Sequence, residues 1–161
     1  MAPADLDRFL AGLDYPMFVV TAAHGGEKSG CLVGFTTQVS LDPQRLLVCL
    51  SVANHTYRVA QRASVLAVHL LRPDQHELAA LFGSESGDEI DKFARCRWQP
   101  GPEDTPLLTD CAVRMVATIL DRIPLGDHVG FLLAPIDIER PEAGPVLTYQ
   151  QVQDLRPGHP A

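Results

Sequence analysis

The chain contains 161 residues, of which 46% are hydrophobic and 20% are charged. These fractions are ordinary for one globular domain and disfavour a disordered, collagen-like or coiled-coil chain. Thirteen Lys and Arg against twenty Asp and Glu give a net charge of −7, and no basic cluster occurs, so we expect neither nucleic acid nor an anionic membrane as a partner. The first residues do not resemble a signal peptide, and no apolar run approaches the roughly 20 residues of a membrane helix, so we expect a cytoplasmic protein.

The N-terminal part of the chain predicts a helix, three strands and a second helix. Apolar residues at helical spacing over 6–13 favour the first helix. Asp42-Pro43 ends the second strand because proline has no amide hydrogen for a strand ladder. Asn54 is expected to cap a short helix that extends to Arg62. The three strands, predicted from runs of Val, Thr and Leu, cover residues 17–23, 29–41 and 46–52.

The rest of the chain predicts a further helix and three more strands. Leu78, Leu81 and Phe82 give the helix one apolar face. The prolines between 100 and 106 indicate a loop. The last two strands are joined by residues 124–127, a spacing that suits a hairpin. The three strands cover residues 65–71, 112–123 and 128–138.

The order of these elements indicates the fold class. Several strands are apolar on both faces, and no helix separates the first two strands or the last two, so a doubly wound parallel sheet is disfavoured. The pattern predicts a mainly β, α+β chain that forms an antiparallel barrel with peripheral helices. We expect a single domain over 1–161, with its core over about 15–140 and a flexible tail over 154–161.

The four cysteines do not form a pattern typical of metal binding. Cys31, Cys49, Cys96 and Cys111 are widely spaced, and no C-x-x-C pair occurs, so we expect no zinc or other metal site. We interpret them as reduced core thiols, with Cys31, Cys49 and Cys111 inside apolar strands.

Several common catalytic motifs do not occur. The sequence contains no G-x-G-x-x-G, Walker A, G-x-S-x-G or H-E-x-x-H pattern. A standard dinucleotide-binding fold, P-loop phosphoryl transfer and zincin chemistry are therefore disfavoured.

A run of small hydroxyl and amide residues gives the first candidate site. Hydroxyls and exposed backbone amides can bind a polar ring edge or a phosphate without net charge. The alternative is an ordinary strand whose threonines face water. The candidate binding residues in this run are Thr36, Thr37, Gln38, Val39 and Ser40.

A second candidate lies just before the predicted short helix. The free amides at a helix start bind anions, and polar side chains add hydrogen-bond donors there. The alternative is a simple helix cap. The candidate residues are Ser51, Asn54, His55 and Thr56.

Two further candidates lie in the second half of the chain. Lys92 is a lone cation beside three acids, Asp88, Glu89 and Asp91, and its ammonium could reach a phosphate while Phe93 packs on a planar ring. The alternative is a solvated acidic loop over 87–93. His128 follows an acid at a strand start, where it could transfer a proton or bind a ligand. Taken alone, this motif favours the alternative of a structural turn. His69, like the remaining histidines, shows no ligand spacing and is interpreted as incidental.

The order of these four stretches resembles the flavin reductase-like family, which has the FMN-binding split barrel fold. That family has a hydroxyl-rich segment ending S-x-D-P, then an S-x-x-x-[HS]-T segment, a D-K-F element and a G-D-H element. This chain has Thr36–Pro43, Ser51–Thr56, Asp91-Lys92-Phe93 and Gly126-Asp127-His128 in the same order. The resemblance covers roughly residues 15 to 140.

The resemblance implies an NAD(P)H-dependent flavin reductase that binds FMN, or FAD, as a homodimer with the flavin near the subunit interface. Residues 36–40 would contact the isoalloxazine edge, and Ser51 with residues 54–56 would hold the ribityl chain and phosphate. Lys92 would pair with the phosphate, Phe93 would pack against the ligand, and His128 would act at the nicotinamide side. Reduced flavin could then serve a monooxygenase component or a bound acceptor.

The chain also departs from the family pattern. Gln44 stands where the family often has a second proline, and Thr37-Gln38 stands where it often has serine and a bulky residue. The preferred flavin therefore stays open. The sequence also leaves open the choice between NADH and NADPH, and the electron acceptor. The alternatives are a deazaflavin-dependent split-barrel reductase, a flavin-binding or storage protein without turnover, and a haem-binding barrel with His55 or His128 as ligand.

Overall fold

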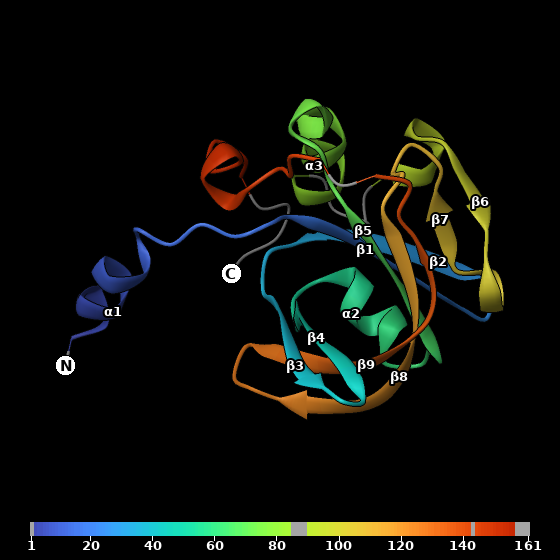
Figure 1. Cartoon of the computed structure of the whole chain (residues 1–161), viewed down its shortest axis with the longest axis horizontal. Helices are drawn as coiled ribbons and strands as arrows, with labels where there is room; N and C mark the ends of the chain where they lie inside the picture. Colours follow the sequence, from blue (N-terminus) through green and yellow to red (C-terminus); the bar gives the residue numbers. More distant parts are fainter. Residues whose placement is uncertain (1, 85–89, 143, 157–161) are drawn as a thin grey trace.

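The computed structural model describes residues 2–84, 90–142 and 144–156. Its main feature is an antiparallel seven-stranded sheet in the order β2-β1-β5-β8-β9-β4-β3, which curves into a barrel (Figure 1). Strands β2 and β3 are the two edges of the sheet, so the barrel is open between them. The predicted antiparallel split barrel is therefore confirmed. The strands are β1 Phe18–His24, β2 Glu27–Val33, β3 Thr36–Leu41, β4 Gln44–Ser51, β5 Val65–Leu70, β8 Arg114–Pro124 and β9 His128–Glu139.

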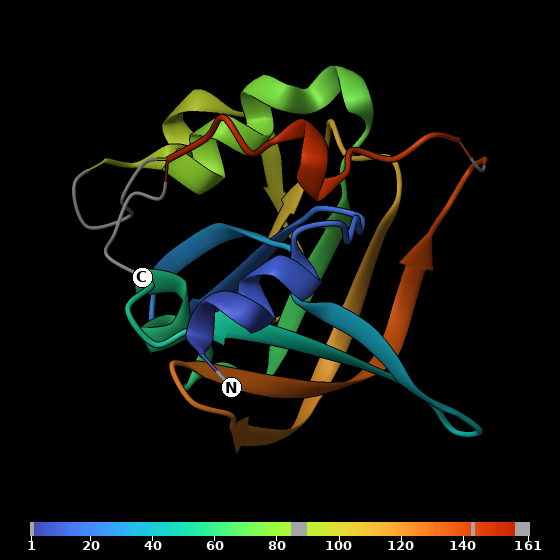
Figure 2. The same ribbon diagram turned by 90° about the vertical axis from the view of Figure 1, so that its left-hand side faces the viewer.

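Helices and a small second sheet surround this barrel. The short strands β6 (Trp98–Pro100) and β7 (Pro106–Leu108) pair with each other in the region predicted as a loop. Figure 2 shows α3 and the C-terminal segment above one side of the barrel. The helices are α1 Pro3–Leu10, α2 His55–Ala60 and α3 His76–Ser84, and single 3-10 turns cover Pro73–Gln75, Lys92–Arg95, Pro102–Asp104 and Tyr149–Gln151.

The strand predicted over 29–41 is wrong in one respect, because it forms two strands on opposite edges of the barrel. β2 pairs with β1, whereas β3 pairs with β4. Gly34 and Phe35 carry the chain across the opening, and the Phe35 carbonyl accepts a hydrogen bond from the Cys49 amide at 2.9 Å. A Cβ on Gly34 would lie 2.5 Å from Cε2 of Tyr15, so only glycine allows this close approach.

Strand β1 contributes to two separate cores because both of its faces are buried. Val20 and Ala22 face the barrel interior with Phe131. Val19 faces the outer core, where it packs with Phe82 of α3 and other apolar residues. This arrangement explains why the sequence of β1 shows no polar alternation.

The short helix α2 lies at one end of the barrel. Its predicted cap is confirmed, since the Asn54 side chain accepts a hydrogen bond from the Thr56 amide at 2.9 Å. At the other end of the helix, Nη2 of Arg122 donates to the carbonyls of Ala60 and Ala63, at 3.1 and 2.6 Å. Arg122 therefore adds a side-chain donor to two carbonyls at this end of the helix.

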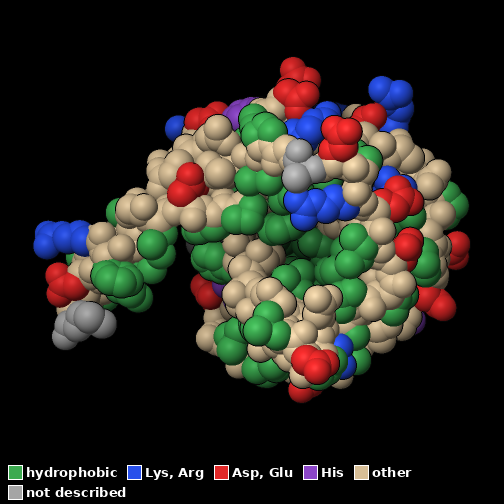
Figure 3. All heavy atoms as spheres, in the orientation of Figure 1, with side chains coloured by type: hydrophobic (Ala, Val, Ile, Leu, Met, Phe, Trp, Pro, Cys, Tyr) green, Lys and Arg blue, Asp and Glu red, His purple; other side chains and the backbone are tan. Residues whose placement is uncertain are grey.

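Helix α1 projects away from the barrel and buries none of its residues. Its apolar face is exposed, with Phe9 at 76% of its full accessible surface, and is seen at the left of Figure 3. Within the described ranges, none of the helices is both long enough and apolar enough to cross a lipid bilayer.

Candidate functional site

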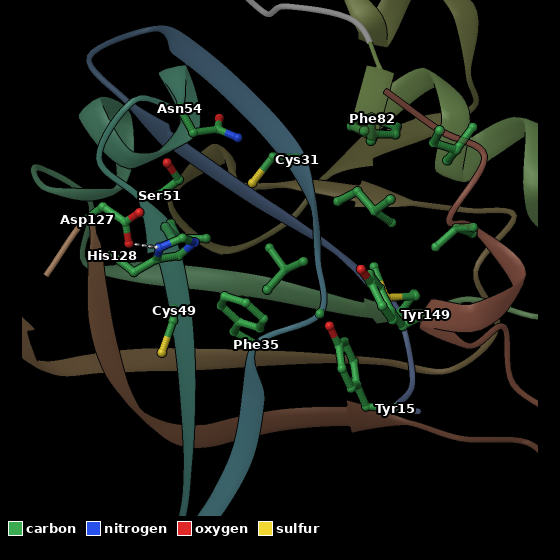
Figure 4. Close-up of a pocket in the computed structure, with 18 residues that line it drawn as sticks. Tyr15, Cys31, Phe35, Cys49, Ser51, Asn54, Phe82, Asp127, His128 and Tyr149 are labelled. Atoms are coloured by element: carbon green, nitrogen blue, oxygen red, sulfur yellow. Dashed lines mark hydrogen bonds and ion pairs between the residues drawn. The ribbon is translucent and has the colours of Figure 1, made fainter. Parts of the chain in front are cut away.

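A cavity of about 480 Å³ lies at the opening of the barrel. Its walls come from β2, the β2–β3 connection, β4, the start of β9, the end of α3 and the C-terminal segment. The volume is within the range of small-molecule sites. The cavity has one polar end and one aromatic end (Figure 4).

The polar end combines Ser51, Asn54, Asp127 and His128. The β4–β9 register places Ser51 opposite His128. Oδ1 of Asp127 lies 2.7 Å from Nδ1 of His128, and this hydrogen bond, with the imidazole charge, lowers the pKa of Asp127. Because a carboxylate only accepts, Nδ1 carries a proton, and Nε2 is the imidazole nitrogen left for a ligand.

The aromatic end is formed by Tyr15 and Tyr149. Their rings are stacked, with centroids 4.9 Å apart and planes 15° apart. Phe35 connects the two ends, since its centroid lies 6.4 Å from that of Tyr15 and 5.1 Å from that of His128. Figure 4 shows Phe35 between these groups. Aromatic side chains therefore extend from one end of the cavity to the other.

The two tyrosines are held by hydrogen bonds between the N-terminal and C-terminal segments. The Tyr149 amide donates to the Tyr15 carbonyl at 2.9 Å. The Gln150 amide donates to Oδ1 of Asp14 at 3.0 Å, and Gln150 Nε2 donates to the Leu13 carbonyl at 2.8 Å. The hydrogen bond from the Gln150 amide lowers the pKa of the Asp14 carboxyl. The aromatic end is thus fixed by several hydrogen bonds.

Three of the sequence-predicted residues line the cavity, namely Ser51, Asn54 and His128. The predicted residues of β3 lie beside the cavity, on an edge strand. Thr36 and Ser40 are half-buried there, whereas Thr37, Gln38 and Val39 are exposed.

His55 and Thr56 do not line the cavity and bind neighbouring side chains instead. Oγ1 of Thr56 is buried and lies 2.8 Å from Oγ of Ser29. Nε2 of His55 lies 2.9 Å from Oε1 of Glu27. These contacts connect the start of α2 to strand β2.

Lys92 and Phe93 lie behind the cavity wall. The Lys92 ammonium is buried and donates to the carbonyls of Gly30 and Phe82, at 3.2 and 3.1 Å. The Phe93 ring packs edge-on against Phe82, with centroids 5.7 Å apart. Phe82 itself lines the cavity. Of the acidic stretch predicted over 87–93, residues 87–89 lie outside the described residues.

Sequence reasoning missed the aromatic residues of the cavity. Tyr15 and Tyr149 belong to none of the motifs and lie near opposite ends of the chain, whereas Phe35 directly precedes the run of candidate residues but was not itself named as a candidate. No local pattern could identify them, because their proximity depends on the segment contacts. The tail predicted from residue 154 also contributes Leu155 to the lining, while residues 157–161 lie outside the described part of the chain.

All four cysteines are free thiols. Cys31 and Cys49 line the cavity; burial raises the pKa of Cys31 to about 11 and also raises the pKa of Cys49. Both thiols are therefore uncharged at neutral pH. Cys111 is buried but precedes β8, so its placement inside a strand was wrong. Among the residues with described positions, no group of three or more His, Cys, Asp or Glu could hold a metal ion.

The chain is similar to several known proteins. The ferric-chelate reductase (NAD(P)H) of Archaeoglobus fulgidus is 26% identical over 91% of this chain and 88% of that protein. The FMN reductase (NADH) RutF of Bradyrhizobium diazoefficiens is 29% identical over 80% of this chain and 71% of that protein. The reductase component of a 4-nitrophenol monooxygenase from Rhodococcus opacus is 25% identical over 82% of this chain and 69% of that protein.

The fold is likewise shared with solved structures. The NADH:FAD oxidoreductase SgcE6 of Streptomyces globisporus superimposes with a TM-score of 0.83 at 24% identity, over 98% of this chain and 94% of that chain. The model of the flavin reductase like domain matches residues 10–156. The chain therefore belongs to the flavin reductase like domain family, as the motif order indicated.

Proposed function

We propose that the chain is an NAD(P)H-dependent flavin reductase that binds FMN, with FAD as the alternative, in the cavity at the barrel opening. The observation that carries this proposal is the composition of the cavity, which joins hydrogen-bonding groups at one end to aromatic side chains at the other. FMN reductase and NADH:FAD oxidoreductase are the activities in the names of two relatives.

The residues present fit a flavin. A flavin has a flat, uncharged ring system with a polar edge and a polar chain. The ring suits the aromatic wall that includes Phe35, and the polar groups suit the end with Ser51 and Asn54. When bound, the flavin supplies the redox chemistry by accepting a hydride from NAD(P)H and passing electrons to an acceptor.

The side chains of the polar end have distinct roles in this proposal. Ser51 and Asn54 orient the polar part of the ligand. His128 holds a proton on Nδ1 through Asp127 and presents Nε2 to the nicotinamide side of the cavity. Phe35 packs against the imidazole and restricts its movement.

The edge-strand residues would contact flavin from the side. Residues 36–40 offer hydroxyl groups and backbone amides on β3 next to the opening. Thr56 and His55 hold the start of α2 to β2, which positions Asn54. Lys92 and Phe93 support the wall that Phe82 forms.

We also propose a homodimer, because apolar side chains are exposed on β3 and at the end of β9. Leu41 exposes 80% of its surface, and Ile136 and Ile138 expose 55% and 57%. Monomeric proteins rarely expose large contiguous apolar patches. Leu41→Glu is expected to shift the mass measured by light scattering from dimer to monomer, whereas Gln99→Glu at an exposed polar position on β6 serves as a surface control. An unchanged mass for Leu41→Glu would remove this face from the interface.

The recipient of the electrons is proposed to be free flavin or a monooxygenase component. A relative is named as such a component. We propose a cytoplasmic location, since the four cysteines are unpaired, as in a reducing compartment.

Absorbance spectroscopy of the purified protein tests this function. FMN and then NADH or NADPH are added under anaerobic conditions, and rapid bleaching of the flavin band is expected. Bound flavin that is barely bleached by either nucleotide would favour a storage or deazaflavin-dependent protein. A Soret band in place of a flavin spectrum would indicate a haem protein.

A further inference from the structure

We propose that Tyr15 and Tyr149 form a subsite for an uncharged, planar, conjugated electron acceptor such as a quinone, and that anionic acceptors such as ferric chelates are used poorly. The inference rests on the proposed flavin reductase activity and names its substrate class. It is carried by the shape and the charge of the aromatic end of the cavity.

The shape favours a flat ligand. The two phenol rings are nearly parallel and stacked on each other, so a conjugated ring can stack against an outer face of the pair or contact its edges. The hydrogen bonds of Gln150 to Asp14 and Leu13 hold the pair in place before any ligand binds. A preformed surface binds a rigid ring with little loss of side-chain freedom.

The close approach of Tyr15 to the chain also fixes the pair. A Cβ on Gly34 would lie 2.5 Å from the Tyr15 ring, so the ring has no room to retreat toward the β2–β3 connection. Burial raises the pKa of Tyr15, so its phenol stays protonated at neutral pH and can donate a hydrogen bond to a quinone oxygen.

The charge of the cavity disfavours anions. Among its described lining residues there is no Lys or Arg, and Asp127 is the single acid. The Lys92 ammonium lies behind the wall, 5.6 Å from the Phe82 ring centre, and donates to backbone carbonyls. At the aromatic end, an anionic acceptor would meet repulsion from the chain's net charge of −7 and from the FMN phosphate, whereas that phosphate itself has the hydroxyl and amide donors of the polar end.

The overall reaction balances without any further reactant. NAD(P)H, one proton and a quinone give NAD(P)⁺ and a hydroquinone. The nicotinamide loses a hydride and is oxidised by two electrons, and the quinone gains two electrons and two protons. One proton comes from solvent, and the hydride lost by NAD(P)H supplies the other proton together with the two electrons.

The first test compares acceptors of the same shape and different charge. Initial rates are measured for the FMN-loaded protein with NADH and either 1,4-naphthoquinone or its 2-sulfonate. We expect the KM of the sulfonate to be at least tenfold higher. Equal KM values, or a lower KM for the sulfonate or for ferric citrate, would overturn the proposal.

A binding measurement provides a readout without turnover. Equilibrium dialysis of the FMN-loaded protein with 4-nitrobenzamide or 4-nitrobenzoate compares two isosteric rings that differ in charge. The amide is expected to bind, and Tyr149→Leu is expected to weaken it about fivefold. Equal binding of both probes, or no loss in Tyr149→Leu, would contradict the subsite.

Further variants test separately whether quinone binding needs the aromatic ring of Tyr149 and the position of the Tyr15 ring. Tyr149→Phe keeps the ring and should preserve the quinone KM, whereas Gly34→Ala displaces the Tyr15 ring and should raise that KM as Tyr149→Leu does. Tyr57→Phe, away from the cavity, is the matched control. If the variants raise the KM of NADH and leave that of the quinone unchanged, the pair binds the donor and the proposal fails.

Failure of the underlying function gives a different result. If NAD(P)H does not reduce added flavin at all, the reductase activity fails before any acceptor is tested. If flavin is reduced but the charge and ring comparisons show no effect, the reductase activity stands and the acceptor subsite is wrong.

Discussion

Two histidines in this protein have opposite surroundings. His69 on β5 is fully buried, and both of its ring nitrogens bind the backbone: Nδ1 lies 2.9 Å from the Val19 carbonyl, and Nε2 accepts from the Leu108 amide at 3.0 Å. His128 lines the cavity, and Oδ1 of Asp127 holds its Nδ1 at 2.7 Å.

In the proposed function, the two histidines have different roles: His69 contributes to stability and His128 to chemistry. The Leu108 amide can only donate, so Nε2 of His69 must accept and the ring must be neutral. Burial lowers the pKa of His69 to about 4, so this imidazole stays neutral at physiological pH. In the proposed function, His128 has one nitrogen held by Asp127 and the other available to a substrate, which is an arrangement suited to acid–base chemistry.

The largest effect is expected when the buried histidine is removed. His69→Ala should lower the free energy of unfolding by about 4 kcal/mol, because it leaves a cavity and two buried backbone groups without partners. Urea denaturation followed by circular dichroism measures this loss. His24→Ala, at an exposed position at the end of β1, should change stability by no more than about 0.5 kcal/mol. A similar small effect for His69→Ala would contradict the structural role of His69.

The buried histidine also predicts a pH dependence. The pKa of His69 is about 4 in the folded chain, against an ordinary value of 6.5, so the unfolded chain binds more protons between these values. The free energy of unfolding should therefore be fully maintained above about pH 6.5 and fall by about 3 kcal/mol as the pH drops to 4. Urea midpoints measured across this range test the prediction. His69→Ala should lack this component, and an identical pH profile in that variant would assign the effect to other groups.

His128 should affect the rate of flavin reduction more than the affinity for flavin. His128→Ala is expected to slow reduction of bound FMN by NAD(P)H about 100-fold, the usual size of an acid–base contribution, with FMN affinity changed less than threefold. Anaerobic stopped-flow absorbance and FMN titration measure the two effects. Asp127→Asn, which keeps the size of the side chain but weakens the hold on Nδ1, should have a smaller effect in the same direction. Unchanged reduction in His128→Ala would exclude the residue from the mechanism.

The fold and the polar end of the site could be predicted because their signals are local. Strand runs and the Asn54 cap depend on neighbouring residues, and Ser51 and His128 occur in short ordered motifs. The aromatic end could not be predicted, because the hydrogen bond between Asp14 and Gln150 joins residues 136 positions apart. The break at Gly34 was missed for a similar reason, since only the ring of Tyr15 shows why glycine is needed there.

The structural role of His69 could not be predicted from the sequence either. Its sequence surroundings gave no sign of a ligand pattern, and it was interpreted as incidental. Its importance comes from Val19 and Leu108, which reach it from β1 and β7. A buried polar side chain gains its role from partners that the linear sequence does not place beside it.

Lys92 shares one property with each histidine. It is buried like His69, and it supports the wall of the cavity that His128 lines. The family resemblance predicts a phosphate contact, in which case Lys92→Met would weaken FMN more than riboflavin. Its ammonium instead bonds the carbonyls of Gly30 on β2 and Phe82 on α3, so we expect about tenfold weaker binding of both ligands through displacement of Phe82. Titrations of FMN and riboflavin, compared between Lys92→Met and Lys92→Arg, measure the ratio of the two losses. Equal losses of FMN and riboflavin affinity in Lys92→Met, with smaller losses in Lys92→Arg, would support a role of Lys92 in positioning Phe82. A loss of affinity for FMN alone would support the phosphate contact, because riboflavin has no phosphate.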